Sequence, residues 1–348
     1  MQRTTIGLDI AKNVFQLHIG SDAGEVPRVE RLTRAKLVAW FSKAPPSLIG
    51  MEACAMAHYW GRELTRLGHE VRLIPPEYVK GFVIGRMKSD ARDARGCYLA
   101  VQQADIKSVP IKTEEQQAGR ALHRSRELLA QQRTQLSNQV RGLCAEFGLI
   151  CNQGYAALSR QLEGIESGAI AVPEMFRDLV VMVAEQLRAV HARERELMAR
   201  IVREAGKDEL ARRLMKVPSI GPVIAHALVV GVVDPAAFSS ARRFAAWLGL
   251  TPGLHASGNK SRLGRITKRG DETLRRLLVL GACSCVKMAK ARPHKADPWL
   301  VGLLARRPFK VVMVAKAAQT ARIVWAMMTR NEQYRPRFSQ AAPAAVAA

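Results

Sequence analysis

The chain has 348 residues, with 54 Lys and Arg against 30 Asp and Glu, and its formal net charge at pH 7 is +24. This charge is far larger than solubility requires, so it indicates a polyanionic partner. The length predicts two or three domains, because one hydrophobic core seldom serves so long a chain. The longest apolar run, 224–233, is too short to span a bilayer. The N-terminus also lacks the apolar stretch of a signal peptide, so we expect a soluble protein that contacts no membrane.

The six cysteines are scattered without C-x-x-C spacing, and the eight histidines form no ligand pattern beside them. Such usage is typical of reduced thiols and excludes a structural zinc site of the usual spacing. We therefore expect a cytoplasmic protein.

Residues 4–104 alternate between strand-like and helix-like stretches. Three early stretches, TTIGLDIA, VFQLHIG and PRVERLT, are typical of consecutive strands. SLIGMEA and EVRLIPP are typical of two more, with helices between them. A run of strands followed by strands that alternate with helices predicts a mixed α/β sheet.

From about residue 113 to 204 the sequence changes to long, polar helices rich in Gln and Arg. Apolar residues recur there at heptad-like positions. They are Leu122, Leu129, Leu136, Val140, Leu143, Phe147, Leu179, Val183, Leu187, Val190, Leu197 and Ile201. Two helices packed on each other within one chain and a coiled-coil dimer seam explain this pattern equally well. The segment NQGYAALSRQLEG, with Gly168, is expected to supply the turn between the helices.

The residues after 205 predict an all-helical basic domain, and the tail SQAAPAAVAA is expected to be disordered. We therefore expect four regions. They are an α/β domain at 1–110, a helical coiled-coil region at 111–205, an all-α domain at 206–335 and a tail at 336–348.

Four carboxylates stand at the ends of predicted elements. Asp9 comes near the end of an apolar strand and Glu52 ends another, while Asp90 and Asp93 share one face of a predicted helix at i, i+3 spacing. Taken singly, each is explained by a turn, a helix N-terminus or a solvated ion pair. Taken together, they are the oxygen donors that Mg²⁺ prefers, with positions left open for phosphate.

An actin-like or sugar-kinase ATPase also begins with a strand that ends in Asp. In those proteins small residues and glycines that approach phosphate follow the aspartate, whereas Ile10, Ala11 and Lys12 follow it here. No glycine-rich nucleotide loop appears later in the chain, so an ATPase is the weaker interpretation.

Two stretches of the C-terminal region are typical of nucleic-acid contact. VPSIGPVIAHAL is similar to a helix-hairpin-helix unit, whose Pro/Gly turn presents backbone N–H groups to phosphate, although a simple tight turn explains it too. The second is a basic stretch punctuated by glycines, which can follow a phosphate backbone closely. Its basic residues are Lys260, Arg262, Arg265, Lys268 and Arg269.

The motifs IGLDIAKN, GMEAC, KSDARDA, IGPVIAHAL, FAAWLGLTP, HASGNKSRLGRITKRGD and LRRLL occur in this order. They resemble the insertion sequence one-ten family of transposases, which are bridge-RNA-guided recombinases, from about residue 5 to 330. The resemblance implies an N-terminal RuvC-like domain of RNase H fold whose DEDD acidic site falls on Asp9, Glu52, Asp90 and Asp93. It further implies a coiled coil and a C-terminal transposase domain with a serine nucleophile.

The resemblance places that nucleophile at Ser257, in the Ser-Gly pair. Relatives often have two serines before the glycine, but this chain has Ala256, so Ser257 is the candidate in the pair and Ser261 is a less favoured rival. A serine hydroxyl is a poor nucleophile near neutral pH and requires activation. His255 would help only with a suitable loop geometry, so we expect activation from a Mg²⁺ ion at the acidic site.

The resemblance implies an RNA-guided recombinase that cleaves and rejoins DNA through a phosphoserine linkage. Its expected partners are donor and target DNA, a structured guide RNA, and further copies of the chain in a homodimer or homotetramer. A RuvC-like endonuclease that hydrolyses junction DNA with water would keep the carboxylates and make Ser257 dispensable. A non-catalytic nucleic-acid-binding protein would need neither the carboxylates nor Ser257.

Overall fold

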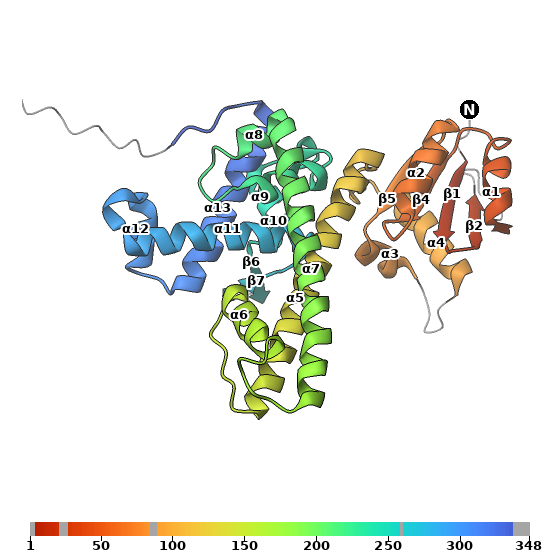
Figure 1. The fold of residues 1–348 in the computed structure, drawn as a ribbon. Coiled ribbons are helices and arrows are strands. Elements are labelled where there is room, and N and C mark those ends of the chain that lie inside the picture. The colour runs from red at the N-terminus through yellow and green to blue at the C-terminus, as the bar shows by residue number, and fades with distance from the viewer. Residues whose placement is uncertain (1–3, 21–26, 84–88, 258–259, 337–348) are drawn as a thin grey trace, which may run out of the picture. The chain divides into compact units, whose positions relative to one another are not determined.

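The structure is a computed structural model that describes residues 4–20, 27–83, 89–257 and 260–336. The tail expected to be disordered lies outside the described residues from 337 onward. The chain divides into two compact units, residues 1–114 and 115–348 (Figure 1). The first unit is a mixed α/β domain and the second is mainly helical, as the sequence predicts for the two ends of the chain.

A five-stranded sheet forms the centre of the first unit, with the strand order β3-β2-β1-β4-β5. β1 pairs antiparallel with β2 and parallel with β4, so the predicted mixed sheet is confirmed. The strands are β1 Thr5–Ile10, β2 Val14–Gly20, β3 Arg28–Thr33, β4 Leu48–Glu52 and β5 Glu70–Ile74. The helices are α1 Arg34–Phe41, α2 Ala57–Arg66, α3 Pro76–Phe82 and α4 Asp90–Val101.

The two faces of this sheet are covered by different helices. Alternate residues of β1 and β4, such as Leu8 and Met51, are fully buried in a core with Leu37 of α1 and Trp60 of α2. The intervening residues face α4, which packs directly on β1, β2 and β4. Because side chains alternate along a strand, one face of each strand supplies the core and the other receives α4.

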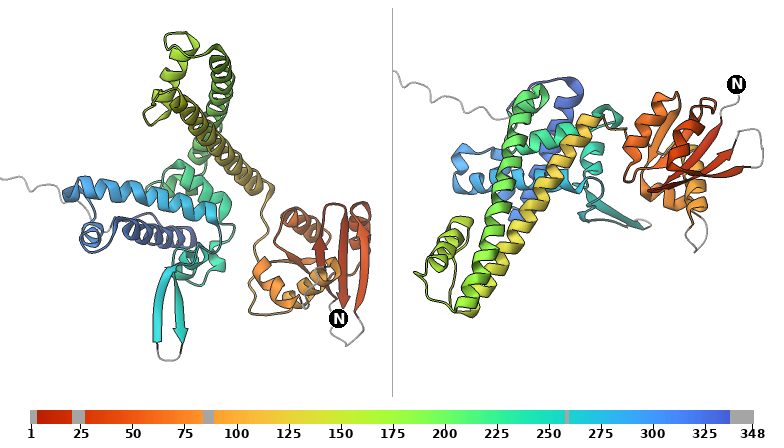
Figure 2. Two further views of the ribbon diagram at one scale, coloured as in Figure 1. Left: turned by 90° about the horizontal axis from the view of Figure 1, so that it is seen from below. Right: turned by 45° about the vertical axis from the view of Figure 1, so that its right-hand side comes forward.

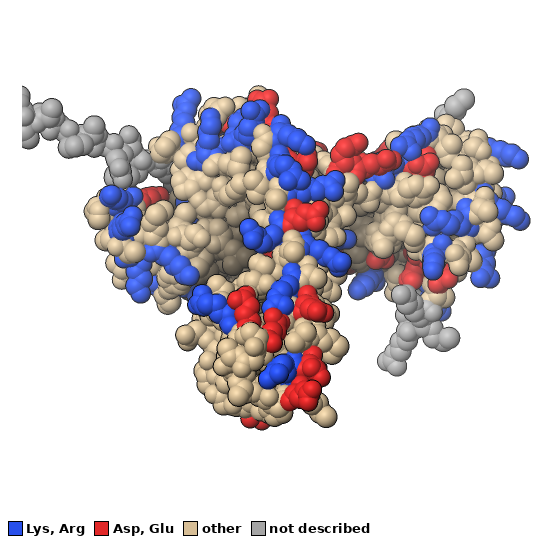
Figure 3. Space-filling model, viewed as in Figure 1, with Lys and Arg blue, Asp and Glu red and all other residues tan. Residues whose placement is uncertain are grey.

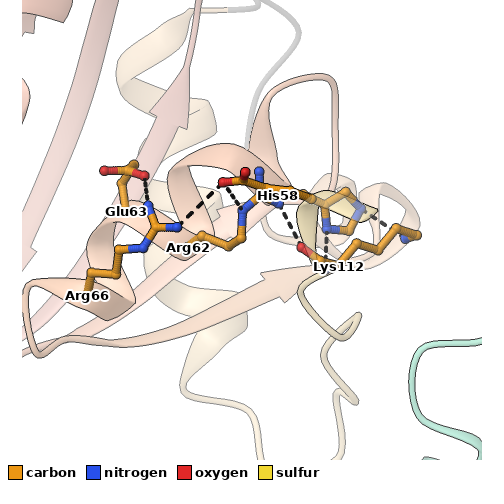
Figure 4. A network of polar contacts seen from close by, with 6 residues as sticks. His58, Arg62, Glu63, Arg66 and Lys112 are labelled. Atoms are coloured by element: carbon orange, nitrogen blue, oxygen red, sulfur yellow. Dashed lines mark hydrogen bonds and ion pairs between the residues drawn. The ribbon is translucent and has the colours of Figure 1, made fainter. Parts of the chain in front are cut away.

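A polar network holds the end of the first unit on α2 (Figure 4). Arg62 donates through Nη1 to the carbonyl oxygen of Lys112 at 2.7 Å, and the backbone N–H of Lys112 donates to Nδ1 of His58 at 3.3 Å. Arg66 pairs with Glu63 and lies 3.5 Å from Glu114. The segment that leads into the next helix is therefore fixed to the first unit by backbone contacts as well as by charges.

The second unit begins with two long helices, α5 Glu114–Glu146 and α7 Glu174–Lys207, as predicted. An ion pair of 2.6 Å between Arg133 and Glu194 joins them. A helix, α6 Tyr155–Glu166, lies in the segment that we expected to be a turn. That expectation was wrong because Gly164 is accommodated within the helix, and only Gly154 and Gly168 flank its two ends. Gly154 and Gly168 have positive φ, and Leu158, Leu162 and Ile165 between them are buried against α5 and α7.

Further helices complete the second unit. They are α8 Glu209–Leu214, α9 Pro222–Gly231, α10 Ala241–Trp247, α11 Glu272–Ala291, α12 Pro298–Leu304 and α13 Phe309–Arg330, with 3₁₀ turns at Pro235–Ala237 and Pro293–Lys295. The predicted domain boundary at 205/206 remains a prediction, since α5 to α13 belong to one compact unit. Among the described residues, only α13 is long and apolar enough to cross a membrane. Val312, Ala317, Ala321 and Val324 of this helix are fully buried in the unit.

The region after 205 is not all-helical, so that part of the predicted fold class is wrong. Strands β6 Pro252–Ser257 and β7 Lys260–Ile266 form an antiparallel hairpin where we expected a loop between helices. Gly253, Gly258 and Gly264 make this stretch a poor helix former. The pair Gly258-Asn259 between two strand-like runs is a hairpin signal that the sequence does contain.

A buried histidine pair joins α5 to α9. Nε2 of His123 lies 2.9 Å from Nδ1 of His226, and both side chains are more than nine-tenths buried. Burial, together with His226, Arg126 and Arg120, lowers the pKa of His123 to about 4. Burial also lowers the pKa of His226, against the opposite effect of Glu204 and Asp208. Both rings are therefore neutral in the folded protein near pH 7.

We expect the second unit to lose stability as the pH falls from about 6.5 towards 4. The unfolded state binds protons at the ordinary histidine pKa of about 6.5, whereas folded His123 resists protonation down to about 4. At ~1.4 kcal/mol per pKa unit, the free energy of unfolding should fall by up to about 3 kcal/mol over this range. Calorimetry from pH 7 to 4 measures this loss, which His123→Gln should reduce. His294→Gln, at an exposed position, is the control and should leave it unchanged.

Candidate active site

The carboxyl ends of β1 and β4 bring two of the predicted acids together. Leu8 pairs with Met51 in the parallel register, so Asp9 and Glu52, the next residues, come side by side at the same edge of the sheet. Both are half-buried. They lie two residues beyond Gly7 and Gly50 and therefore on the sheet face that receives α4.

Gly7 and Gly50 allow the backbone of α4 to touch the sheet. A Cβ added at Gly7 would collide with the carbonyl oxygen of Ala94, and one at Gly50 would lie 2.7 Å from the carbonyl oxygen of Cys97. Contact at this range requires glycine on the strand, since any side chain would hold the helix away. The helix N-terminus thereby comes to the edge that carries Asp9 and Glu52.

The first turn of α4 supplies the other two acids, as their i, i+3 spacing predicts. α4 begins at Asp90, and Asp93 follows in the same turn. Burial, followed by repulsion from Asp93, Asp90 and Glu52, raises the pKa of Asp9 to about 6. All three of the other carboxylates therefore raise the pKa of Asp9, and the four acids predicted from the sequence form one electrostatic cluster.

The chemistry of this cluster suits a hard divalent cation, because carboxylate oxygens are the donors that such ions prefer. A bound cation would also relieve the mutual repulsion that raises the pKa of Asp9. In the described part of the chain, however, no three His, Cys, Asp or Glu side chains are arranged to hold a metal ion. The four acids thus lie near one another without forming a closed coordination shell.

Arg34 lies beside this edge of the sheet, and no sequence motif predicted a role for it. Its Nη1 lies 3.3 Å from the carbonyl oxygen of Lys12 and 3.6 Å from Sδ of Met56, and its guanidinium lies 5.1 Å from the ring centroid of Trp60. These contacts hold an exposed positive charge on the loops that follow β1 and β4. No local pattern marks Arg34, because its three partners come from distant parts of the sequence.

The predicted nucleophile Ser257 is exposed and is the last residue of β6. Its backbone partner is Lys260, and His255 pairs with Arg262, so strand alternation places Ser257, His255 and Arg262 on one face of the hairpin. The rival Ser261 belongs to the opposite face. A Cβ added at Gly264 would lie 3.1 Å from Nε2 of His255. The imidazole therefore extends along the same face towards Gly264, which lies in the direction away from Ser257.

The base of the hairpin is rigidly fastened to the helices. Gly249 and Gly270 both have positive φ, and a Cβ at Gly249 would lie 2.5 Å from the carbonyl oxygen of Arg269. Nη1 of Arg275 donates to the carbonyl oxygens of Leu248 and Arg269 at 3.3 and 2.8 Å. The two legs of the hairpin are thus tied together at its base.

A carboxylate connects this base to the long helix α5. Oδ1 of Asp271 caps α11 by accepting from the backbone N–H of Leu274 at 2.9 Å, and its Oδ2 accepts from Nη1 of Arg120 at 2.7 Å. Arg276 and Glu127 form a second ion pair between the same helices at 2.6 Å. The position of the hairpin therefore depends on α5 as well as on α11.

The basic residues predicted to bind nucleic acid lie on this hairpin and its exit. Arg262, Arg265, Lys268 and Arg269 are exposed, and Lys260 begins β7. Lys and Arg side chains are spread over the visible face of both units (Figure 3). The helix-hairpin-helix expectation falls on α8, α9 and the segment between them, where Ser219 has φ of 86°. Its role in phosphate binding remains a prediction.

Comparisons with known proteins identify the family of this chain. Residues 6–147 match a family model described as Transposase, of the DEDD type of IS110, and residues 211–297 match the Transposase IS116/IS110/IS902 family. A family 20 transposase of Pseudomonas aeruginosa is 43% identical over 97% of this chain and 100% of its own length.

Two transposases of insertion sequence elements are also similar to this chain. The one for IS1111A of Coxiella burnetii is 36% identical over 95% of this chain and 91% of its own length. The one for IS1328 of Yersinia enterocolitica is 34% identical over 94% of this chain and 97% of its own length. Fold, acidic cluster and relatives thus define the class as transposases with a DEDD domain. Within that class, the chain belongs to the IS110 family.

We expect Gly7→Ala to damage the acidic cluster through the position of α4. The added methyl group meets the backbone of α4, which cannot move aside cheaply, so the first unit should lose at least about 1–3 kcal/mol of stability. DNA cleavage should fall together with the melting temperature of this unit. Gly81→Ala is the matched control, because a Cβ at Gly81 meets nothing within 4 Å. Equal behaviour of the two variants would contradict the role of glycine in this packing.

Proposed function

We propose that this transposase is an RNA-guided DNA recombinase, which cleaves and rejoins strands through Ser257 with help from the acidic cluster. One observation carries the proposal: an exposed serine ends a strand of a basic hairpin whose base is fastened to the surrounding helices. A hydroxyl held in this way can approach a DNA phosphate, while neighbouring arginines bind the backbone on either side.

The proposed chemistry of Ser257 exchanges one phosphate ester bond for another, so the energy needed for rejoining is kept. Its Oγ attacks the phosphorus of a DNA phosphodiester, the bond from phosphorus to one sugar oxygen breaks, and that oxygen leaves as a hydroxyl with a proton. The resulting phosphoserine ester is then attacked by the hydroxyl of another strand, which restores the serine. The ring of His255 extends towards Gly264, on the far side of His255 from Ser257, so we propose that activation comes from elsewhere.

The acidic cluster is the candidate for that activation. Asp9, Glu52, Asp90 and Asp93 would hold a divalent cation, for which we propose Mg²⁺, and the bound ion would supply positive charge to a phosphate. The residues themselves would position the ion. Asp9 and Glu52 project from the sheet edge, while Asp90 and Asp93 come from the first turn of α4.

Donor and target DNA are the proposed substrates, and a structured guide RNA is the proposed partner that selects them. The net charge of +24 and the exposed basic hairpin support binding of both. The apolar heptad positions of α5 and α7 that remain partly exposed support assembly into a homodimer or homotetramer, and we place this activity in the bacterial cytoplasm, at the nucleoid. RNA-free preparations, with no salt-sensitive binding to structured RNA, would contradict the guided mechanism.

A RuvC-like endonuclease is the second candidate, and the acidic cluster favours it. That enzyme would use water in place of Ser257 and leave no protein on the DNA. The two functions therefore differ in one measurable product, a covalent adduct between protein and DNA.

We expect Ser257→Ala to abolish a covalent adduct that the unaltered protein forms with DNA. Denatured reactions, digested and analysed by mass spectrometry, locate the modified peptide. Ser261→Ala is the matched control, since Ser261 is exposed on the opposite face of the same hairpin and should be dispensable. An adduct that survives in Ser257→Ala contradicts the assignment, and cleavage with no adduct in any variant favours the endonuclease.

We expect Asp9→Ala or Asp93→Ala to remove DNA cleavage in Mg²⁺ while RNA binding stays within about twofold, because each change removes an oxygen donor and no phosphate contact. Gel assays of cleavage and filter binding of the co-purified RNA measure the two effects. Full cleavage by either variant would contradict the proposed metal site. A mixture of Asp9→Ala and Ser257→Ala chains that regains activity would indicate that two protomers share one site.

A further inference from the structure

The hairpin that carries Ser257 also carries two exposed leucines. Leu254 is 65% exposed and Leu263 is 68% exposed, and they are direct partners in the β6–β7 register. Partners in an antiparallel pair project from the same face, so the two side chains form one apolar pair. Strand alternation places this pair on the face opposite Ser257 and Arg262.

No element of the second unit covers this pair in the described part of the chain. The hairpin stands away from the helices in both views of Figure 2 and joins them at its base. Two leucines on a two-stranded ribbon do not form part of a hydrophobic core, because the ribbon has no second layer to pack against. Their exposure leaves them available to a partner that would cover them during function.

The charges around the leucines identify the kind of partner. The stretch 252–270 contains no Asp or Glu, and it carries exposed cations near the pair in the sequence. These cations are Arg265 of β7, Lys268 and Arg269 just beyond its end, and Arg262 on the opposite face of the ribbon. A surface of isolated apolar groups among cations is complementary to nucleic acid, whose stacked bases are apolar and whose flanking phosphates are anionic.

We propose that Leu254 and Leu263 form an apolar wedge that enters duplex DNA and unstacks neighbouring bases beside the strand that Ser257 attacks. Leu254 precedes Ser257 by three residues, which is about 10 Å along a strand, so wedge and nucleophile reach within three base steps of each other. A two-stranded ribbon is narrow enough to enter a DNA groove, and apolar wedges of this kind partly unstack base steps.

The wedge deepens the proposed function and rests on it, because pairing of DNA with a guide RNA requires the duplex to open. Unstacking at the hairpin would start that opening next to the bound phosphates. The leucines themselves read no base, so the wedge is expected to act on many sequences. Specificity would remain with the RNA.

The test uses DNA duplexes with 2-aminopurine at successive positions, bound by the full-length protein at low salt. The fluorescence of this base rises when it loses its stacking neighbours. We expect the unaltered protein to raise it severalfold at one or two adjacent positions. The double variant Leu254→Thr, Leu263→Thr should lose most of this rise while its affinity for DNA changes less than about threefold, because phosphate contacts dominate affinity. Threonine keeps the strand preference of the hairpin.

Two control variants show whether the fluorescence rise depends on the wedge itself. Leu280→Thr replaces an exposed leucine on α11, 54% exposed, and should leave the rise unchanged. Ser257→Ala should also leave it unchanged, so the wedge and the serine chemistry can fail independently. The proposal is overturned if the unaltered protein causes no rise, or if the double leucine variant keeps it. It is also overturned if that variant becomes monomeric in sedimentation, since the leucines would then contact a second copy.

Discussion

The contact between the backbone of α4 and the glycines of two neighbouring strands is the constraint on which the acidic cluster depends. Gly7 and Gly50 let the helix lie directly on the sheet, and the same strand faces carry Asp9 and Glu52 two residues later. Sheet and helix therefore meet where their carboxylates also meet. An ordinary helix packing distance would separate the two pairs of acids.

This closeness has an electrostatic cost that the fold tolerates. Burial and three neighbouring carboxylates favour the protonated form of Asp9, whose pKa is raised to about 6. Acids that only capped turns or completed surface ion pairs would be arranged near cations, which lowers a carboxyl pKa. Repulsion maintained within a folded domain is instead typical of sites that bind a cation or act on a substrate.

The sequence predicted the positions of the acids better than the reason for their convergence. Asp9 and Glu52 end apolar runs and Asp90 opens a helix, so local pattern was sufficient for each element. The roles of Gly7 and Gly50 depend on what lies across from them, and Ala94 and Cys97 are far away in the sequence. Arg34 was missed for the same reason, because its partners come from two other loops.

The hairpin was missed for a different physical reason. Strands are recognised by alternation between a buried and an exposed face, but both faces of β6 and β7 are exposed where Leu254 pairs with Leu263. Basic residues and glycines then suggested a loop. The helix α6 was missed because its terminal glycines, which end a helix as readily as they form a turn, were taken for the connection itself.

The carboxylate of Asp271 assigns one oxygen to the cap of α11 and the other to Arg120 of α5. The two helices are thereby held in one register. A shift of α5 by one residue would rotate its side chains by about 100° and break the contact between Arg120 and Asp271. Asp271 would then keep only its cap of α11, immediately after the hairpin exit. The contacts of one carboxylate thus make the register of α5 a condition for the geometry at the exit of the hairpin that holds Ser257.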